Sequence, residues 1–528
     1  MVRKEIEKLT EKAVKDLYGK EIAVSIERPS ESVYGDYSTN IAMTIKKNPQ
    51  EIADAISSAT ELSQEARGKK RTRFSSPILE KTEVKNGFIN FFISKEYLQK
   101  QIVEILKQKE SFGKLKIGRG QKVNVEFISA NPTGPLTLGN GRGGFCGDVL
   151  ANVLDKAGYK TEREYYINDV GEQIKKLGHS VIGDSEAVYK GAYIEELRKK
   201  IKGGNLEEVG RKSAETILGE TIKPSVKKMG IEFNAWFRES ELYKKKEIDK
   251  ILEELERKNL SYKKEGALWF QSTKFGDDKD RVLIKADGEK TYLASDIAYL
   301  KNKFKRGFDK LIYFLGADHY GYVGRIKAAA EALGFKKEQV DIIIMQLVRL
   351  VEGGKEMKMS KRTGFYVTID ELIGEVGLDV ARFFFLTRSP DTHLNFDLDL
   401  AKQQSEKNPV FYVQYAHARI CSILKKIPNS KFQIQNLKLL DHPSELSLVK
   451  QLIRLPEIIE DTAEDYQVQR LPQYALDVAA VFHQFYRDCR VISEEKKLTQ
   501  ARLSLVSATG IMLKNILNLM GISAPEKM

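Results

Sequence analysis

The sequence predicts a multidomain α/β chain, in which a parallel sheet with helices on both faces lies between a small N-terminal α+β segment and a C-terminal all-α helical bundle. Three observations predict this fold class. Segments with the apolar–polar pattern of strands alternate along the chain with segments of helical periodicity over about 116–388. After about residue 385 only helical periodicity remains. The 528 residues also suffice for three or four domains of about 150 residues each.

The composition is that of an ordinary globular chain. Hydrophobic residues make up 41% and charged residues 30%, which excludes collagen-like, mucin-like and mostly disordered proteins. Lys and Arg exceed Asp and Glu by 87 − 74 = 13, which permits a polyanionic partner without requiring one. No apolar run approaches the roughly 18 residues of a membrane-spanning helix. Cys146, Cys421 and Cys489 stand too far apart for a disulfide framework or a zinc site, so we expect a cytoplasmic protein without membrane contact.

The first predicted domain covers residues 1–115. An amphipathic helix starts the chain, and a second helix is predicted near 41–62 after an irregular stretch at 28–37. A basic tract at 67–73 has no apolar period, which favours an exposed loop, with a phosphate contact as the alternative. The apolar run at 87–93 predicts a β-strand.

The second predicted domain covers residues 116–388, with a polar helical insertion at about 175–280. Its strands are expected at 122–128, 161–167, 281–284, 310–315 and 340–346, and its helices near 144–157, 295–303 and 324–333. Strands that alternate with helices indicate a parallel sheet covered on both faces. The third domain, 389–528, is expected to be a helical bundle, with helices at 448–459, 474–489 and 504–519.

A loop rich in glycine and proline, SANPTGPLTLGNGRGG at 129–144, follows the first strand of this sheet and leads into a helix. Its glycines let the backbone approach a ligand closely, and the helix start offers N–H groups that favour phosphate. Gly139, Gly141 and Gly144 also match GxGxxG, and Glu164 stands where a ribose-binding acid would fall. A nicotinamide-linked oxidoreductase is therefore an alternative. That fingerprint should follow its strand directly, however, and about ten residues intervene here.

A second loop, GGKEMKMSKRTG at 353–364, carries four cations within eight residues between glycines. Lysines on such a loop can close over a polyphosphate and neutralise the charge that builds on it. On charge alone, a solvated basic loop is the alternative.

Taken together, the two loops resemble the HIGH and KMSKS signatures of class I aminoacyl-tRNA synthetases, and longer strings resemble the arginyl-tRNA synthetase family. These strings are GDYSTN (35–40), SANPTGPL (129–136), YINDVGEQ (166–173), TYLASDIAY (291–299), GADHYGY (316–322), KMSKR (358–362), DVAR (379–382), YAHAR (415–419) and GISAP (521–525). Any one string could be chance, but the ordered set covers nearly the whole chain and is very specific.

The resemblance implies an arginine–tRNA ligase with a Rossmann-like catalytic domain, an N-terminal tRNA-binding domain and a C-terminal anticodon-binding domain. Such an enzyme activates L-arginine with ATP, giving arginyl-adenylate and pyrophosphate. It then transfers the arginyl group to the 3′-terminal adenosine of tRNA(Arg). Mg²⁺ is expected with ATP, held mainly by the phosphates rather than by a metal site of the protein. We expect a monomer.

The resemblance also implies roles for particular residues. The catalytic residues would be Thr137, Asn140, Lys358 and Lys361. The ATP-binding residues would be Pro132, Gly134, Gly139, Gly141, Met359 and Ser360. The arginine-binding residues would be Glu126, Asn131, Tyr292, Asp296 and His319, because a buried guanidinium needs carboxylates placed for a two-pronged hydrogen bond. The tRNA-binding residues would be Tyr412, Tyr415 and Arg419, since splayed bases stack on aromatic and Arg planes.

One departure from the family pattern lies in the first signature, where TLGN at 137–140 replaces His-x-Gly-His. Thr137 and Asn140 can each donate a neutral hydrogen bond to ATP phosphates. Losing one well-aimed donor can nevertheless cost on the order of 3 kcal/mol. A catalytically impaired, synthetase-like tRNA-binding protein therefore stays open, beside the oxidoreductase and a synthetase for another amino acid.

Overall fold

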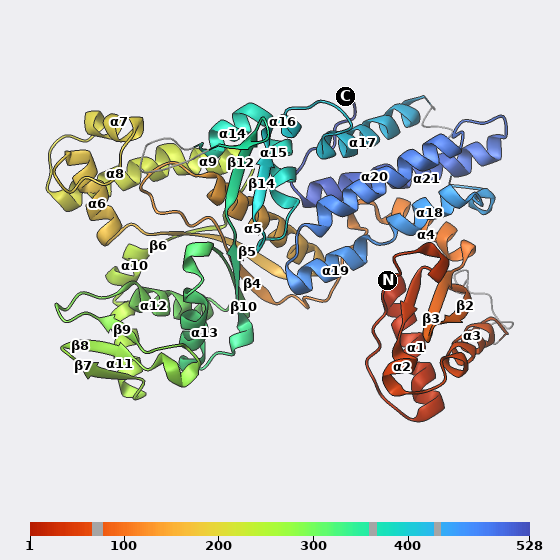
Figure 1. The fold of residues 1–528 in the computed structure, drawn as a ribbon, viewed down its shortest axis with the longest axis horizontal. Helices are drawn as coiled ribbons and strands as arrows, with labels where there is room; N and C mark the ends of the chain where they lie inside the picture. The colour runs from red at the N-terminus through yellow and green to blue at the C-terminus, as the bar shows by residue number, and fades with distance from the viewer. Residues whose placement is uncertain (66–77, 358–366, 427–433) are drawn as a thin grey trace.

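The chain folds around a central parallel sheet, with a separate N-terminal lobe and a long array of C-terminal helices beside it (Figure 1). This computed structural model describes residues 1–65, 78–357, 367–426 and 434–528. The basic tract at 67–73 and the loop at 358–362 lie outside the described residues. Among the described helices, none combines the length and the apolar character that crossing a bilayer requires.

The N-terminal lobe is a three-stranded antiparallel sheet, ordered β1-β3-β2, with helices packed against it. The single helix predicted near 41–62 is wrong, because the chain breaks there into two. Lys46 adopts a left-handed conformation with φ 54°, and Pro49 then begins a new helix, where its fixed φ fits the first turn. The elements are α1 (Val2–Tyr18), β1 (Tyr37–Thr39), α2 (Ile41–Ile45), α3 (Pro49–Glu65), β2 (Leu79–Lys85), β3 (Phe88–Ile93) and α4 (Lys95–Gln108).

The central sheet has five parallel strands in the order β11-β10-β4-β5-β6. The chain adds strands in one direction from β4 to β6, and then returns to the other side of β4 for β10 and β11. Connections therefore diverge between β4 and β10, and ligands bind outside the carboxyl ends of the strands at such a point. The strands are β4 (Lys122–Glu126), β5 (Lys160–Ile167), β6 (Ala235–Arg238), β10 (Lys310–Gly316) and β11 (Val340–Met345).

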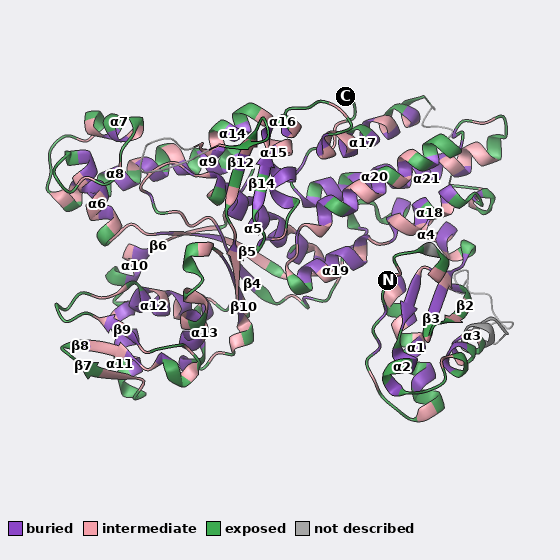
Figure 2. Ribbon diagram, viewed as in Figure 1, coloured by how far each residue is buried: buried purple, intermediate pink, exposed green. Residues whose placement is uncertain are grey.

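Helices cover both faces of this sheet, as predicted. Leu311 and Tyr313 of β10 pack into one apolar cluster with α12 (Tyr292–Lys305) and α13 (Tyr322–Ala332). The alternate residues Ile312 and Phe314 belong to the cluster that contains α5 (Leu138–Ala157). Figure 2 shows this buried band running through the sheet and its flanking helices.

The structure corrects three predictions about strands. The stretch at 175–280, expected to be helical, also contains strands, and one of them, β6, joins the central sheet. The predicted strand at 281–284 belongs to a separate antiparallel sheet, ordered β7-β8-β9. Strands also continue beyond residue 385, because β14 pairs with β12. These strands are β7 (Ser261–Lys264), β8 (Ala267–Phe270), β9 (Arg281–Ile284), β12 (Val348–Glu352), β13 (Lys355–Glu356) and β14 (Leu394–Asp397).

The remaining helices form the insertion and the C-terminal part. The helix predicted at 448–459 is two helices, α18 and α19, with Pro456 in the first turn of the second. Those of the insertion are α6 (Glu172–Ile182), α7 (Ala192–Lys200), α8 (Leu206–Ile217), α9 (Lys223–Lys228), α10 (Glu239–Lys244) and α11 (Glu247–Arg257). Those after residue 366 are α14 (Ile369–Val376), α15 (Leu378–Leu386), α16 (Leu398–Ala401), α17 (Pro409–Lys425), α18 (Pro443–Leu452), α19 (Leu455–Asp465), α20 (Arg470–Asp488) and α21 (Lys496–Leu519).

Candidate active site

The first loop leaves β4 at the point where the sheet connections diverge. Ile128 and Ser129 both have positive φ, 66° and 37°. For a β-branched residue such as Ile128 this conformation is strained, and such strain concentrates at functional sites. Neighbouring elements hold the loop in place: Ser129 Oγ accepts the Tyr166 N–H at 3.0 Å, and Tyr165 Oη donates to the Ala130 carbonyl at 2.9 Å. The loop is thus fixed to β5 immediately beyond the end of β4.

The two residues that replace the family's histidines cap the helix after this loop. The Thr137 N–H and the Thr137 hydroxyl each donate to Asn140 Oδ1 at 2.9 Å. The Asn140 N–H lies 3.5 Å from Thr137 Oγ1. This reciprocal capping box starts α5 at Leu138, earlier than the predicted start near 144. Because Thr137 uses its hydroxyl proton here, Asn140 retains the amide NH₂ as the donor of this pair.

The other ATP candidates of the loop differ in exposure. Gly139 is exposed and Pro132 is buried. A Cβ added at Gly134 would lie 3.3 Å from the Tyr193 hydroxyl, so this stretch passes close to α7. Gly141 is buried, and a Cβ there would lie only 2.5 Å from Ile369. Packing alone therefore explains why Gly141 lacks a side chain.

The same packing removes the basis of the nicotinamide alternative. A Cβ on Gly144 would lie 2.6 Å from Met229, so this glycine too permits close helix packing. Glu164, the candidate ribose-binding acid, is fully buried. Arg306 donates to both of its oxygens, at 2.5 and 2.8 Å, and Tyr299 donates to it as well. Glu164 is therefore occupied inside the protein and is not available to a dinucleotide.

The first loop is joined directly to the chain that follows the second loop. Thr137 forms an isolated antiparallel bridge with Thr368, and the Ile369 N–H donates to the Leu136 carbonyl at 3.0 Å. Lys358, Met359, Ser360 and Lys361 themselves lie outside the described residues. The described chain resumes at Val367, so the contact is between the first loop and the residues that follow the second one.

Three carboxylates from three elements lie at this end of the sheet. Glu126 ends β4, Glu239 begins α10 directly after β6, and Asp296 lies in the second turn of α12. Burial, together with the charges of Glu239 and Glu126, raises the pKa of Asp296 to about 8, although Arg325 acts in the opposite direction. Burial also raises the pKa of Glu239. The charges of Glu126 and Glu239 both act on Asp296, so this acid lies in a region that disfavours negative charge until a cation enters.

Each predicted arginine-binding residue lies at this end of the sheet or beside it. Tyr292 starts α12 one turn before Asp296 and is 43% exposed. His319 ends the short helix that follows β10, and its ring meets Tyr322 edge-on at 5.6 Å. Asn131 is exposed on the first loop. The structure adds Glu239, which sequence reasoning missed because the short strand β6 before it was not predicted.

An aromatic and cationic cluster lies on α17 and α20, in the helical C-terminal part. The Arg419 guanidinium lies 4.8 Å from the Tyr415 ring centre and 5.0 Å from that of Tyr486. The Tyr412 ring packs against His483 at 4.8 Å. Tyr415 and Tyr486 are 37% and 38% exposed, so flat surfaces are open on this face. The structure thus brings the three tRNA candidates together and adds His483 and Tyr486, which the sequence did not single out.

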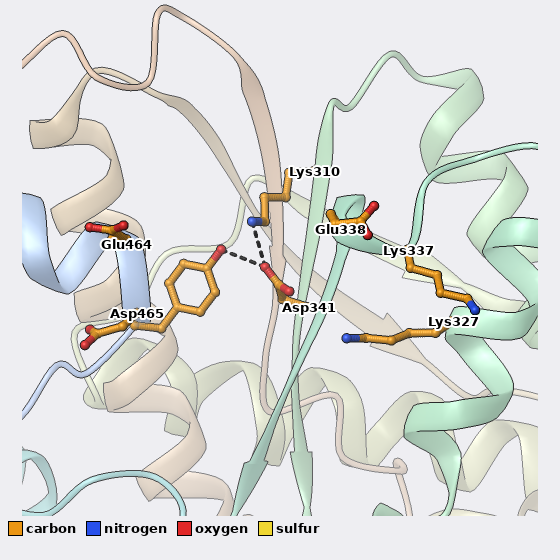
Figure 3. Close-up of a pocket in the computed structure, with 8 residues that line it drawn as sticks. Lys310, Lys327, Lys337, Glu338, Asp341, Glu464 and Asp465 are labelled. Carbon is orange, nitrogen blue, oxygen red and sulfur yellow. Dashed lines mark hydrogen bonds and ion pairs between the residues drawn. The ribbon is translucent and has the colours of Figure 1, made fainter. Parts of the chain in front are cut away.

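A separate cleft of about 450 Å³ lies at the opposite edge of the sheet (Figure 3). Its wall includes Lys310 and Asp341, near the starts of β10 and β11, where Lys310 Nζ lies 2.7 Å from Asp341. Tyr466, after α19, donates to the same carboxylate at 2.8 Å. Because substrates bind at the carboxyl ends of parallel strands, this cleft is not the active site.

Comparisons with known proteins match the chain along its length. Three family models match it: the arginyl tRNA synthetase N terminal domain over 2–93, the catalytic domain of class I (R) tRNA synthetases over 181–397, and the DALR anticodon binding domain over 413–528. The solved arginyl-tRNA synthetase of Thermus thermophilus covers 100% of both chains with a TM-score of 0.80, at 23% identity, and shows the same fold.

Curated relatives are similar over nearly their whole length. An arginine–tRNA ligase of Caldanaerobacter subterraneus subsp. tengcongensis is 44% identical over 538 residues, which cover 96% of this chain and 94% of that protein. One from Bacillus velezensis is 44% identical over 540 residues, with the same coverage. Since relatives this similar align over nearly the whole chain, it belongs to the arginyl-tRNA synthetases, the arginine–tRNA ligases of class I.

Proposed function

We propose that the chain activates L-arginine with ATP and transfers the arginyl group to the 3′-terminal adenosine of tRNA(Arg). The arginine carboxylate attacks the α-phosphorus of ATP, and pyrophosphate leaves. A ribose hydroxyl of the terminal adenosine then attacks the arginyl carbonyl, and AMP leaves. Both steps need positioning and charge stabilisation more than a protein nucleophile. The observation that carries the proposal is the acidic pocket of Glu126, Glu239 and Asp296 beside the first signature loop.

Arginine recognition follows from this pocket. A guanidinium presents its donors in a rigid planar fork, which carboxylates match. In this proposal Asp296 and Glu239 accept hydrogen bonds from it, and Tyr292 lies one turn from Asp296 along the same helix face. We assign Asn131 and His319 to the α-amino and carboxylate end or to the ribose. A lysine substrate would leave buried acceptors unpaired, which discriminates strongly against it.

ATP would lie over the first loop, near Pro132, Gly134, Gly139 and Gly141. Asn140 can offer its NH₂ group to a phosphate, and the N-terminus of α5 adds a favourable dipole. From the second loop, Met359 and Ser360 would contact ATP, and Lys358 and Lys361 would neutralise charge on the phosphates. Among the described residues, no group of three or more His, Cys, Asp and Glu side chains could hold a metal ion. We propose that Mg²⁺ is held mainly by the ATP phosphates and water, as its coordination preference favours.

The helical part would hold the tRNA. Tyr412, Tyr415 and Arg419 offer surfaces on which anticodon bases can stack, and Tyr486 extends them. The N-terminal lobe would contact a part of the tRNA other than the anticodon. We propose that the enzyme acts as a monomer in the cytoplasm.

Charging of total tRNA with each of the twenty labelled amino acids tests the function. We expect charging with arginine alone. Tight tRNA binding without any charging would instead favour the impaired, synthetase-like protein. In that case the variant T137H/N140H, which restores the family's histidines, should gain activity.

A further inference from the structure

A row of charged and polar side chains crosses the central sheet below the acidic pocket. Glu126 of β4 is in register with Glu164 of β5 on one side and with Tyr313 of β10 on the other. Side chains in register on neighbouring strands point to the same face. Two carboxylates side by side on that face repel each other, so the row needs a cation.

Lys303 of α12 supplies this cation. Its side chain is 0% exposed, and its Nζ lies 2.6 Å from Glu126 Oε2 and 3.8 Å from Glu164 Oε1. The rings of Tyr299 and Tyr313 enclose the ammonium at 4.5 and 4.1 Å. Lys303 also lies seven residues after Asp296, two turns along the same face of α12. The helix α12 thus carries both Asp296, one of the three acids, and Lys303, the cation that pairs with Glu126.

The two glutamates differ in what else they contact. Glu164 has Arg306 and Tyr299 in addition, so it remains paired without Lys303. Among the contacts of the described residues, Lys303 is the one ion-pair partner of the Glu126 side chain. The Lys303 bond occupies Oε2 of Glu126, whereas Oε1 is left for another donor.

We propose that Lys303 is a positioning residue of the arginine pocket, which holds one oxygen of Glu126 so that the other can accept a hydrogen bond from a cationic group of the substrate. The inference rests on the proposed function, in which Glu126 contacts arginine. Lys303 also balances the charge of Glu126, one of the three acids. Without it, Glu126 would lose the ion pair that fixes the orientation of its carboxylate.

The variant K303M tests this by removing the charge while keeping an unbranched side chain. We expect the KM for arginine to rise about tenfold or more in charging assays, with the KM for ATP and kcat changed much less, because the loss is in substrate binding. K303R, which keeps the charge, should recover much of the affinity. K301M is the matched control, since Lys301 on the same helix pairs with Glu254 instead and should leave the KM for arginine unchanged.

A double variant keeps the test decisive if K303M does not fold. E126Q/K303M removes both partners, so no buried charge is left alone. If Lys303 acts through Glu126, the double variant and E126Q have the same KM for arginine. Two results would overturn the proposal. One is a wild-type KM for arginine in folded K303M, and the other is a KM for arginine in E126Q/K303M that is a further tenfold higher than in E126Q. Failure of the proposed function is distinct, because the wild-type protein itself would then charge no arginine.

Discussion

The protonation of Asp296 should determine how arginine binding depends on pH. Asp296 is half-buried, and desolvation together with the charges of Glu239 and Glu126 raises its pKa to about 8. A raised pKa means that the carboxyl stays protonated at neutral pH in the empty enzyme and ionises as pH increases. Only the ionised form can pair with the guanidinium, so arginine capture should improve as pH rises toward 8.

We therefore expect kcat/KM for arginine to increase by about tenfold per pH unit below pH 8 and then to level off, because this ratio reports groups of the free enzyme. The measurement is charging of tRNA at limiting arginine between pH 6 and 9. The same profile at limiting ATP and saturating arginine is the control, since bound arginine keeps Asp296 ionised. A flat arginine profile across this range would argue against a protonated Asp296.

Sequence reasoning at the residue scale identified acids that belong to recognisable strings, such as Glu126 and Asp296. It missed Glu239, because the strand before it is only four residues long and lies in a charge-rich insertion. It also missed Lys303, since nothing in a helical sequence reveals that a lysine is fully buried between two tyrosine rings. Both roles depend on contacts between segments that are distant in sequence.

The element that most changes the interpretation of the first signature is α5. Thr137 and Asn140 form its capping box, so the side chains in the positions of the family's histidines also stabilise a helix. An Asn140 variant can separate the two roles, because the side-chain oxygen serves the cap and the NH₂ group is free to donate to ATP.

N140D keeps the accepting oxygen, and we expect little loss of stability but a clearly raised KM for ATP, since a donor becomes a negative charge near phosphate. N140A should lose both the helix cap and the donor to ATP. The loss of the cap should lower the free energy of unfolding by about 1 kcal/mol. N205A is the matched control, because Asn205 caps α8 through the Glu208 N–H at 3.0 Å and lies in the insertion. Chemical denaturation and ATP kinetics measure the two effects. An unchanged KM for ATP in N140D would exclude the proposed contact.

At the scale of the whole molecule, α19 connects the N-terminal lobe to the rest. Glu457 is buried, and it accepts from Tyr37 Oη at 2.6 Å and from the Arg3 N–H at 3.3 Å. Arg3 also pairs with Glu460 and Asp461 on the same helix. This explains why Tyr37, in the GDYSTN string, is fully buried: it fixes the orientation of one domain on another.

We expect E457Q to weaken the docking of the N-terminal lobe by about 3 kcal/mol, because removing one partner of a buried pair leaves the others unpaired. Limited proteolysis and the radius of gyration in solution measure this, with faster cleavage and a larger radius as the expected result. E464Q is the control, since Glu464 lies exposed on the same helix. Equal cleavage and equal radius in both variants would show that Glu457 does not hold the lobe.

The architecture of the whole chain was largely predictable, because alternation of strands and helices over the middle and helical periodicity afterwards are long, repeated signals. The strands β7, β8 and β14 were not, since short strands in charged sequence carry no clear period, and β9 was predicted but assigned to the central sheet. The start of α5 was misplaced because its first turns contain four glycines, which are poor helix formers in isolation.

Discrimination between arginine and citrulline tests the central claim most directly, because citrulline has nearly the same shape but a neutral ureido group in place of the guanidinium. In competition with labelled arginine during tRNA charging, citrulline should require at least about 10³-fold higher concentration than unlabelled arginine for equal inhibition. E239Q should narrow this gap, whereas E241Q, altered at a half-buried acid on the same helix that pairs with Lys245, should not. Equal competition by citrulline and arginine in the wild-type enzyme would contradict recognition of the guanidinium by carboxylates.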